Sequence, residues 1–197
     1  MIVGMSKIIV EDFPKTCLRL KYSSLTYLSL SWTVTIFTAF FNFGSSGILI
    51  NLLDISLIVQ LLVLVFSIYF VWQWLKKLYS TAKQVDKGNN LTYRTGWAFW
   101  GWVVPIAFFW IPKKMIDQAL KVLSGTNSKS LESITKTWWT LWIISILVGN
   151  LSFRAFANEL YSVELIILLI ESILLTFAYP MWIKLIDTSN KLVLQNQ

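Results

Sequence analysis

Four stretches of the chain are apolar over the length that a lipid bilayer requires. They cover residues 25–43, 55–75, 137–153 and 163–186, and two of them contain nearly unbroken aliphatic runs, Val59–Phe66 and Leu165–Leu175. A helix of about 20 apolar residues crosses the hydrocarbon core and satisfies every backbone polar group within itself. The pattern therefore predicts an all-α integral membrane protein with four transmembrane helices.

A fifth apolar segment, residues 97–112, differs from the other four in length and in proline content. Its 16 residues would extend about 24 Å as a straight helix, which is less than the ~30 Å of the hydrocarbon core. Pro105 lies at its midpoint, where a proline removes a backbone donor and clashes with the preceding turn. Helix tilt and bilayer thinning tolerate some mismatch, so length alone does not decide whether the segment spans the membrane.

The distribution of basic residues favours a hairpin over a fifth span. If the segment 97–112 leaves the membrane on the side where it entered, and the amino terminus is cytoplasmic, all of the 17 basic residues except Arg154 lie on the cytoplasmic side. A crossing would place Lys113 to Lys136 outside and remove this bias. The positive-inside rule therefore predicts a re-entrant or interfacial hairpin, with both termini cytoplasmic. Because non-helical backbone at membrane depth must be satisfied by protein or water, we expect the hairpin to pack against the four spans.

The resulting prediction is a single membrane domain over residues 1–197, placed as a multi-pass protein in the plasma (inner) membrane. Residues 1–24 are expected to form a cytoplasmic N-terminal segment, and residues 187–197 a cytoplasmic tail. The N-terminal segment has no apolar run long enough for the core of a signal peptide, so no cleaved targeting segment is expected.

Apolar periodicity predicts two helical segments on the cytoplasmic side. An i, i+4, i+8, i+11 stripe extends the second span toward a stop at Gly88, and its members are Trp74, Leu78, Ala82 and Val85. A second apolar face follows Pro112 and ends at Ser124-Gly125, and its members are Met115, Ile116, Ala119, Leu120 and Leu123. This second helix has two interpretations: an amphipathic helix on the inner membrane surface, or a helix packed on its neighbours.

Composition supports the membrane class and argues against several kinds of site. The chain is 56% hydrophobic, and its mean hydropathy is +0.63. A single cysteine, Cys17, excludes an intrachain disulfide, and with no histidine in the sequence we expect no metal and no cofactor. The net charge of +7 is attributed to the excess of basic residues on the cytoplasmic side of a membrane protein, so nucleic acid is not an expected partner.

A pattern of glycine, tryptophan and proline lies between residues 96 and 142. Its members are Gly96-Trp97-Ala98, Gly101-Trp102, Pro105-Ile106-Ala107 and Pro112, followed after a polar loop by Trp138-Trp139 and Trp142. This pattern resembles bacterial membrane proteins grouped as domain of unknown function 4328, over roughly residues 72–153. The resemblance implies a fold and a membrane location but no activity. Members of that family commonly carry Asn where this chain has Phe108, so a role that depends on the amide is not expected here.

Glu171 lies near the middle of the fourth predicted span. A charged group at the centre of a transmembrane helix costs about 2.5–3.5 kcal/mol on insertion scales, so its side chain is expected to face protein or water, or to be protonated. Glu164 precedes it by two helical turns on the same face. Plausible polar partners at comparable depth are Gln60 and Asn150, with Arg154 at the outer edge. The group is interpreted either as a proton or cation site, or as a structural group that fixes helix register or a subunit contact.

Three further patterns have both a structural and a functional interpretation. Ser31, Thr35, Thr38 and Asn42 form a polar seam on the first span, which indicates helix packing more than a pore lining. The tryptophans fit an aromatic belt at the inner interface or a substrate platform; they are Trp97, Trp100, Trp102, Trp110, Trp138, Trp139 and Trp142. Three lysines near the inner leaflet are candidates for contact with anionic lipid headgroups, namely Lys113, Lys114 and Lys121.

The sequence contains no recognisable catalytic constellation. It has no histidine, no Gly-x-Ser-x-Gly, no phosphate loop and no dense carboxylate cluster. The leading hypothesis is a non-enzymatic accessory or scaffold subunit of a membrane complex, whose partners are the lipid bilayer and other membrane subunits or further copies of itself. The runner-up is a small transporter or channel component with a proton or cation site at Glu171, and an enzyme acting on lipid is third.

Overall fold

The computed structural model describes residues 12–43, 47–86, 88, 90–125, 128–158 and 160–196, with the side chains of 41–43, 47–54, 57, 128, 153, 157 and 161 outside the description. Within these ranges the regular secondary structure is entirely helical, which confirms the all-α prediction. The helices are α2 (Phe13–Phe43), α3 (Gly47–Val85), α4 (Trp97–Val103), α5 (Pro105–Phe108), α6 (Ile111–Ser124), α7 (Ser128–Ala157) and α8 (Tyr161–Gln195). Residues 1–11 of the predicted N-terminal segment lie outside the described residues.

Three of the described helices are long and apolar enough to cross a membrane. The qualifying segments are Ile58–Val85 in α3, Lys129–Phe156 in α7 and Ser162–Gln195 in α8. They contain most of the predicted second span and all of the third and fourth, as a multi-pass membrane protein requires. The predicted first span is a continuous part of α2 but is not among the three. The side chains of residues 41–43, at the end of this span, lie outside the described residues, and the span remains a prediction.

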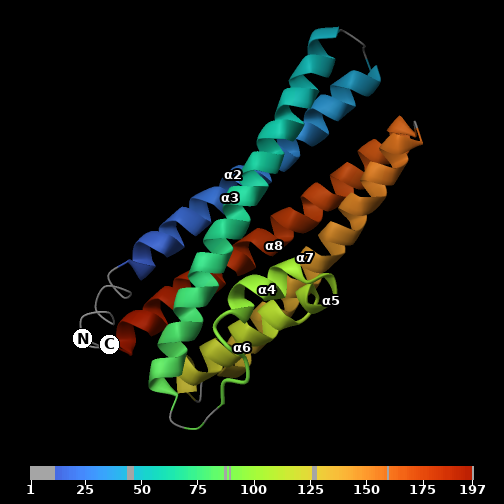
Figure 1. Cartoon of the computed structure of the whole chain (residues 1–197). Helices are drawn as coiled ribbons and strands as arrows, with labels where there is room; N and C mark the ends of the chain where they lie inside the picture. The colour runs from blue at the N-terminus through green and yellow to red at the C-terminus, as the bar shows by residue number, and fades with distance from the viewer. Residues whose placement is uncertain are drawn as a thin grey trace.

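The long helices form two hairpins, α2 with α3 and α7 with α8, joined where α2 packs on α8. The hairpins diverge toward their α2–α3 and α7–α8 connections, and they converge where α2 begins and α8 ends (Figure 1). At the convergent end Lys21 of α2 forms an ion pair with Asp187 of α8, and the Trp182 indole N–H donates to Ser24 Oγ at 3.0 Å. This end holds the two hairpins together.

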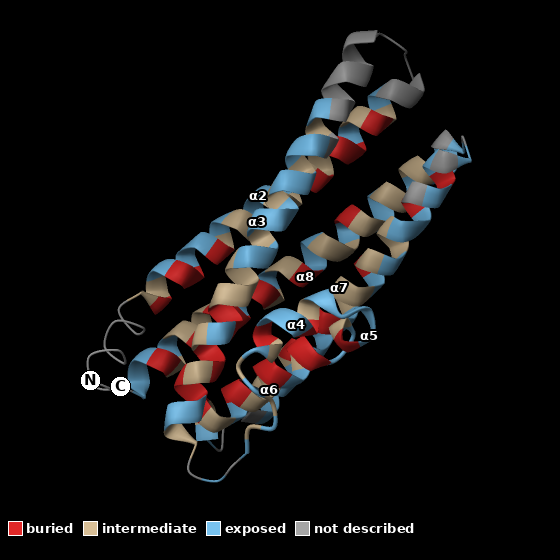
Figure 2. Cartoon of the chain, viewed as in Figure 1, coloured by how far each residue is buried: buried red, intermediate tan, exposed pale blue. Residues whose placement is uncertain are grey.

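The buried core is concentrated at this convergent end, around α6 (Figure 2). The predicted stripe on α3 is confirmed, because Trp74, Leu78 and Ala82 are fully buried. The apolar face predicted for α6 is buried as well, with Met115, Ile116 and Ala119 each 0% exposed and the helix packed on α3 and α7. The interpretation of this face as a membrane-surface contact is therefore wrong, because neighbouring helices cover it.

Away from this core, the long helices carry large apolar side chains on their outer surfaces. On α3 alone the exposed set includes Ile55, Ile58, Leu61, Leu62, Val65, Phe66 and Tyr69. An apolar surface of this extent is typical of a helix that lies against lipid or another membrane protein.

The segment 97–112 is broken at the predicted position. Helix α4 ends at Val103, Val104 is extended with ψ of 115°, and Pro105 begins the short helix α5. The chain then folds back, since a Cβ at Gly101 would lie 3.2 Å from Ile111 Cγ2 and 3.4 Å from Pro112 Cδ. The segment is thus a compact helical hairpin rather than one straight helix. Its depth in the membrane remains a prediction.

Candidate functional site: a cavity at Glu171

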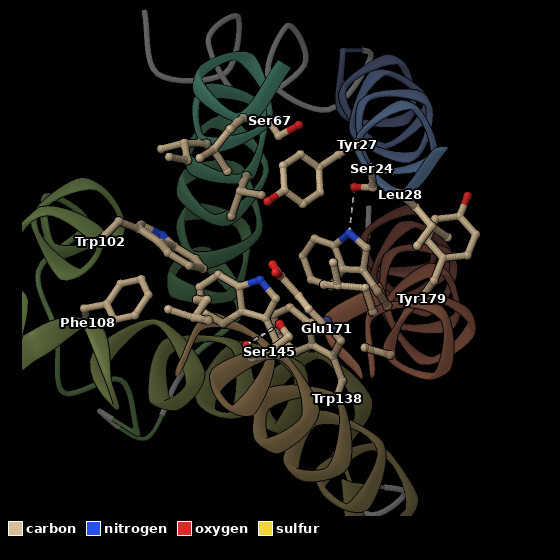
Figure 3. A pocket seen from close by; sticks show the side chains of 18 of the residues that line it. Ser24, Tyr27, Leu28, Ser67, Trp102, Phe108, Trp138, Ser145, Glu171 and Tyr179 are labelled. Carbon is tan, nitrogen blue, oxygen red and sulfur yellow. Dashed lines mark hydrogen bonds between the residues drawn. The ribbon is translucent and has the colours of Figure 1, made fainter. Parts of the chain in front are cut away.

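A cavity of about 460 Å³ lies where the two long hairpins and the α4–α5 segment meet. Its walls come from five parts of the chain (Figure 3). The lining residues are Ser24, Tyr27 and Leu28 of α2; Leu64, Ser67, Ile68 and Val71 of α3; Trp102, Val103 and Phe108 of the broken segment; Trp138, Trp142, Ser145 and Ile146 of α7; and Glu171, Leu175, Ala178, Tyr179 and Trp182 of α8. We refer to it below as the Glu171 cavity. Its volume falls within the range of small-molecule sites.

Glu171 reaches the cavity because α7 offers no side chain in its way. A Cβ added at Gly149 would lie 2.9 Å from both carboxylate oxygens of Glu171, closer than real Cβ atoms approach other heavy atoms. Small residues at helix contacts in membranes allow such close approach. The sequence analysis missed Gly149, although a glycine within an apolar helix is a recognisable signal of close packing.

The seam between α2 and α8 fixes the rotation of α8 about its own axis. Ser172 Oγ lies 3.1 Å from Ser31 Oγ and 3.0 Å from Thr35 Oγ1, and all three side chains are buried. These contacts confirm the packing interpretation for Ser31 and Thr35. Thr38 is also buried, and the side chain of Asn42 lies outside the described residues. With Ser172 held against α2, the neighbouring Glu171 is turned toward the cavity.

Of the partners predicted for Glu171, none lines the cavity. Gln60 lies near Tyr27, and the Tyr27 hydroxyl points with Glu171 toward the middle of the cavity (Figure 3). Asn150 is exposed and donates its amide N–H to the Ile146 carbonyl of its own helix at 2.8 Å. Arg154 is exposed, Glu164 is half-buried, and neither lines the cavity. The predicted contacts of Asn150 and Arg154 with Glu171 are therefore not formed.

One wall of the cavity is a continuous group of aromatic rings. Trp138 stacks on Trp182 at 4.3 Å between ring centroids and 14° between planes. Trp142 lies 5.5 Å from Trp102 at 79° and 5.2 Å from Phe108. The sequence pattern suggested either a belt or a platform, and these rings face an interior cavity. Trp100 and Trp110 differ, because both are exposed.

Two polar atoms at the cavity lack a protein partner. Three indole N–H groups at or near the site have protein acceptors: Trp182 donates to Ser24 Oγ, Trp74 to Ser189 Oγ and Trp139 to the Phe109 carbonyl, each at 3.0 Å. By contrast, Trp102 Nε1 and Ser67 Oγ are buried with no hydrogen bond to any described residue. A buried donor without a partner is costly, so these atoms mark a place where a bound molecule or water would be stabilised.

The glycine, tryptophan and proline pattern builds the hairpin beside this cavity. Gly96 precedes α4 as its N-cap residue, Pro105 begins α5, and Pro112 lies in the first turn of α6. Trp97 is half-buried against the core. Trp139 fastens the hairpin to α7 through its bond to the Phe109 carbonyl, while Trp102 and Trp138 line the cavity.

The three lysines on α6 differ in their surroundings. Lys113 is paired with Asp117 one turn later, whereas Lys114 and Lys121 are exposed. Burial raises the pKa of Asp117, and the hydrogen bond from Lys113 opposes that shift. Contact with lipid headgroups remains a prediction for Lys113, Lys114 and Lys121.

Apolar helices of spanning length around a shared cavity define a polytopic membrane protein of the α-helical class. Residues 51–177 match the sequence profile of the family described as domain of unknown function (DUF4328). The match covers more than half of the 197 residues, and the chain belongs to this family. No curated protein and no solved structure matches the chain. The matched region extends beyond the resemblance seen at residues 72–153 and includes Gly149 and Glu171.

Proposed function

We propose that this protein binds a small molecule inside the membrane, in the Glu171 cavity, as a small transporter or a component of one. The observation that carries the proposal is a carboxylate that faces a cavity of about 460 Å³ and has no cationic partner in the part of the chain that the structure describes. A charged group within a transmembrane helix is expensive and usually marks a substrate or ion pathway.

The proposed topology places this cavity within the inner membrane. Four spans (α2, α3, α7 and α8) surround it, the 97–112 segment enters from the cytoplasmic side as a re-entrant hairpin, and both termini are cytoplasmic. Support comes from the clustering of all basic residues but Arg154 on one side in this arrangement. The fold supports it too, because α2 begins and α8 ends at the same end of the molecule (Figure 1).

Under the accessory-subunit hypothesis, the Glu171 carboxylate fixes helix register or contacts another subunit. The carboxylate lies against Gly149 of its own chain and beside an open cavity, and this arrangement favours a ligand over a protein partner. The exposed apolar surface of α3 fits a partner subunit and lipid equally well, so it does not decide between the two functions.

The test compares the small molecules that co-purify with three forms of the full chain. Wild type, Glu171→Gln and Glu164→Gln are purified in lipid nanodiscs, and the retained small molecules are identified by mass spectrometry. Glu164→Gln is the matched control, because it makes the same change on the same helix outside the cavity lining. We expect wild type and Glu164→Gln to retain a compound that Glu171→Gln lacks. Identical small-molecule content in all three would contradict the proposal, and loss of a bound protein from Glu171→Gln alone would favour the accessory subunit.

A further inference from the structure

The Glu171 cavity is lined by one carboxyl group and by no basic side chain. The ion pairs among the described residues join Lys21 to Asp187, Lys77 to Asp12 and Lys113 to Asp117, so none of them neutralises Glu171. Because a paired cation stabilises the ionised form of a carboxyl group in apolar surroundings, this lining favours a cationic ligand.

The lining favours an organic cation over a metal ion. Within the described ranges no group of three or more His, Cys, Asp or Glu side chains comes together, and one carboxylate with a few hydroxyl groups gives too few oxygen ligands for a divalent metal. Much of the lining is aromatic instead: Trp102 and Trp142 meet at 79° with centroids 5.5 Å apart, and Tyr27 and Trp138 also line the space. Tryptophan and tyrosine rings around a pocket bind alkylammonium groups through their π faces.

The unpartnered polar atoms add a second requirement. The indole N–H of Trp102 can only donate, so it needs an acceptor. It is buried without one among the described residues, as is Ser67 Oγ, and both residues line the cavity. Trp182 also lines the cavity, but its indole N–H already donates to Ser24 Oγ. A ligand that satisfies Trp102 must therefore carry a hydrogen-bond acceptor in addition to its positive charge.

Building on the proposed function, we infer that the Glu171 cavity binds an organic ammonium ion that also carries a hydrogen-bond acceptor such as an ester or amide carbonyl. Glu171 provides the counter-charge, the rings of Trp102 and Trp142 contact the cation, and the Trp102 indole N–H donates to the acceptor, with the Ser67 hydroxyl beside it.

Three matched probes test this inference with the full chain in phosphatidylcholine nanodiscs. Benzoylcholine carries both the ammonium group and the ester; 3,3-dimethylbutyl benzoate is its uncharged isostere; and trimethyl(3-phenylpropyl)ammonium has the charge without the ester. Binding is measured by equilibrium dialysis, with empty nanodiscs subtracted for partition into lipid. We expect saturable binding of benzoylcholine that is about tenfold or more tighter than that of its uncharged isostere, because the isostere lacks the charge that pairs with Glu171 and contacts the aromatic rings.

Variants of the protein test the contribution of the Glu171 charge and that of the Trp102 indole N–H separately. Glu171→Gln removes the counter-charge, so it is expected to weaken benzoylcholine binding by about tenfold or more and to leave the uncharged isostere unaffected, which also shows that the variant is folded. Glu164→Gln should bind all three probes as wild type does. Trp102→Phe keeps a ring but removes the donor and weakens the cation–π contact, so it should weaken benzoylcholine binding severalfold more than it weakens binding of the ester-free cation.

The outcomes separate this inference from the proposed function. Equal binding of benzoylcholine and its uncharged isostere, or absence of saturable benzoylcholine binding, overturns the inference. In either case the proposed function is decided by the co-purification experiment: it holds if wild type retains a small molecule that Glu171→Gln lacks. If that retained compound is neutral or anionic, the cavity is a ligand site but the inference on charge is wrong.

Discussion

Gly149 of α7 and Glu171 of α8 share one small space at the contact between their helices, because a Cβ on Gly149 would lie 2.9 Å from each carboxylate oxygen. The carboxylate is the far end of a flexible side chain and can rotate away. We therefore expect Gly149→Ala to lower the free energy of unfolding by only about 1 kcal/mol or less, below the usual cost of overpacking a core. It should nevertheless abolish retention of the Glu171-dependent small molecule, since the carboxylate is displaced.

A double-mutant cycle separates displacement from a general defect in α7. Thermal unfolding is measured for Gly149→Ala, Glu171→Ala and the double variant. Because Glu171→Ala removes the atoms that a new Cβ would meet, Gly149→Ala should cost less in that background than in wild type. An equal cost in both backgrounds would show that Gly149 is needed for a reason unrelated to Glu171.

Ser172 joins α8 to α2 through its contacts with Ser31 and Thr35. Ser172→Ala removes both contacts, and single interhelical hydrogen bonds in membrane proteins contribute about 0.6 kcal/mol on average. We expect a loss of about 1 kcal/mol in the free energy of unfolding, measured by thermal unfolding in nanodiscs. The control is Ser162→Ala at an exposed position of the same helix, which should leave stability unchanged; an equal loss there would contradict the assignment.

Features governed by local rules could be predicted from the sequence. Pro105 breaks the 97–112 segment because proline cannot continue a helix through its interior. The stripe through Trp74, Leu78 and Ala82 and the seam at Ser31 and Thr35 follow from helical periodicity, which fixes the residues that share a face. The family pattern was also recognisable, because tryptophan and proline are distinctive at fixed spacing.

Features that depend on how helices are rotated and placed could not be predicted in this way. Asn150 and Arg154 were expected near Glu171 from their depth along α7, but depth does not tell which way a helix faces its neighbour. The apolar face of α6 was equally compatible with lipid and with protein, because periodicity reports a buried face without naming what buries it. The cavity itself arises from the divergence of two hairpins, and no single segment encodes that angle.

The ion pair between Lys77 and Asp12 makes stability depend on pH. The hydrogen bond from Lys77 lowers the pKa of Asp12 below its ordinary value of 3.8. A lowered pKa in the folded state stabilises the protein above the unfolded-state pKa, and this contribution is lost as the pH falls through the folded-state pKa. The Tm difference between wild type and Asp12→Asn should therefore be present at pH 7 and vanish as the pH falls below 3.8.

The expected effect of Asp12 is small, about 1 kcal/mol or less, because its side chain is half exposed and solvent screens the pair. Its origin is tested by repeating the pH series in a Lys77→Gln background, where Asp12→Asn should no longer change the Tm. A difference that persists without Lys77, or that grows toward low pH, would assign the stabilisation to another contact.

Cys17 allows the topology to be tested in the otherwise unaltered chain. Its side chain is 3% exposed, and burial raises the pKa of the thiol to about 12. Since the thiolate is the reactive form, Cys17 should not react with a maleimide at neutral pH in the folded protein. New cysteines at the exposed positions Ser130 and Asn158 should then be labelled from opposite sides, Ser130→Cys only from the cytoplasm and Asn158→Cys only from outside. Labelling of Ser130→Cys and of a cysteine at the exposed position Asn90 from opposite sides would show that residues 97–112 cross the membrane, and the re-entrant hairpin would have to be abandoned.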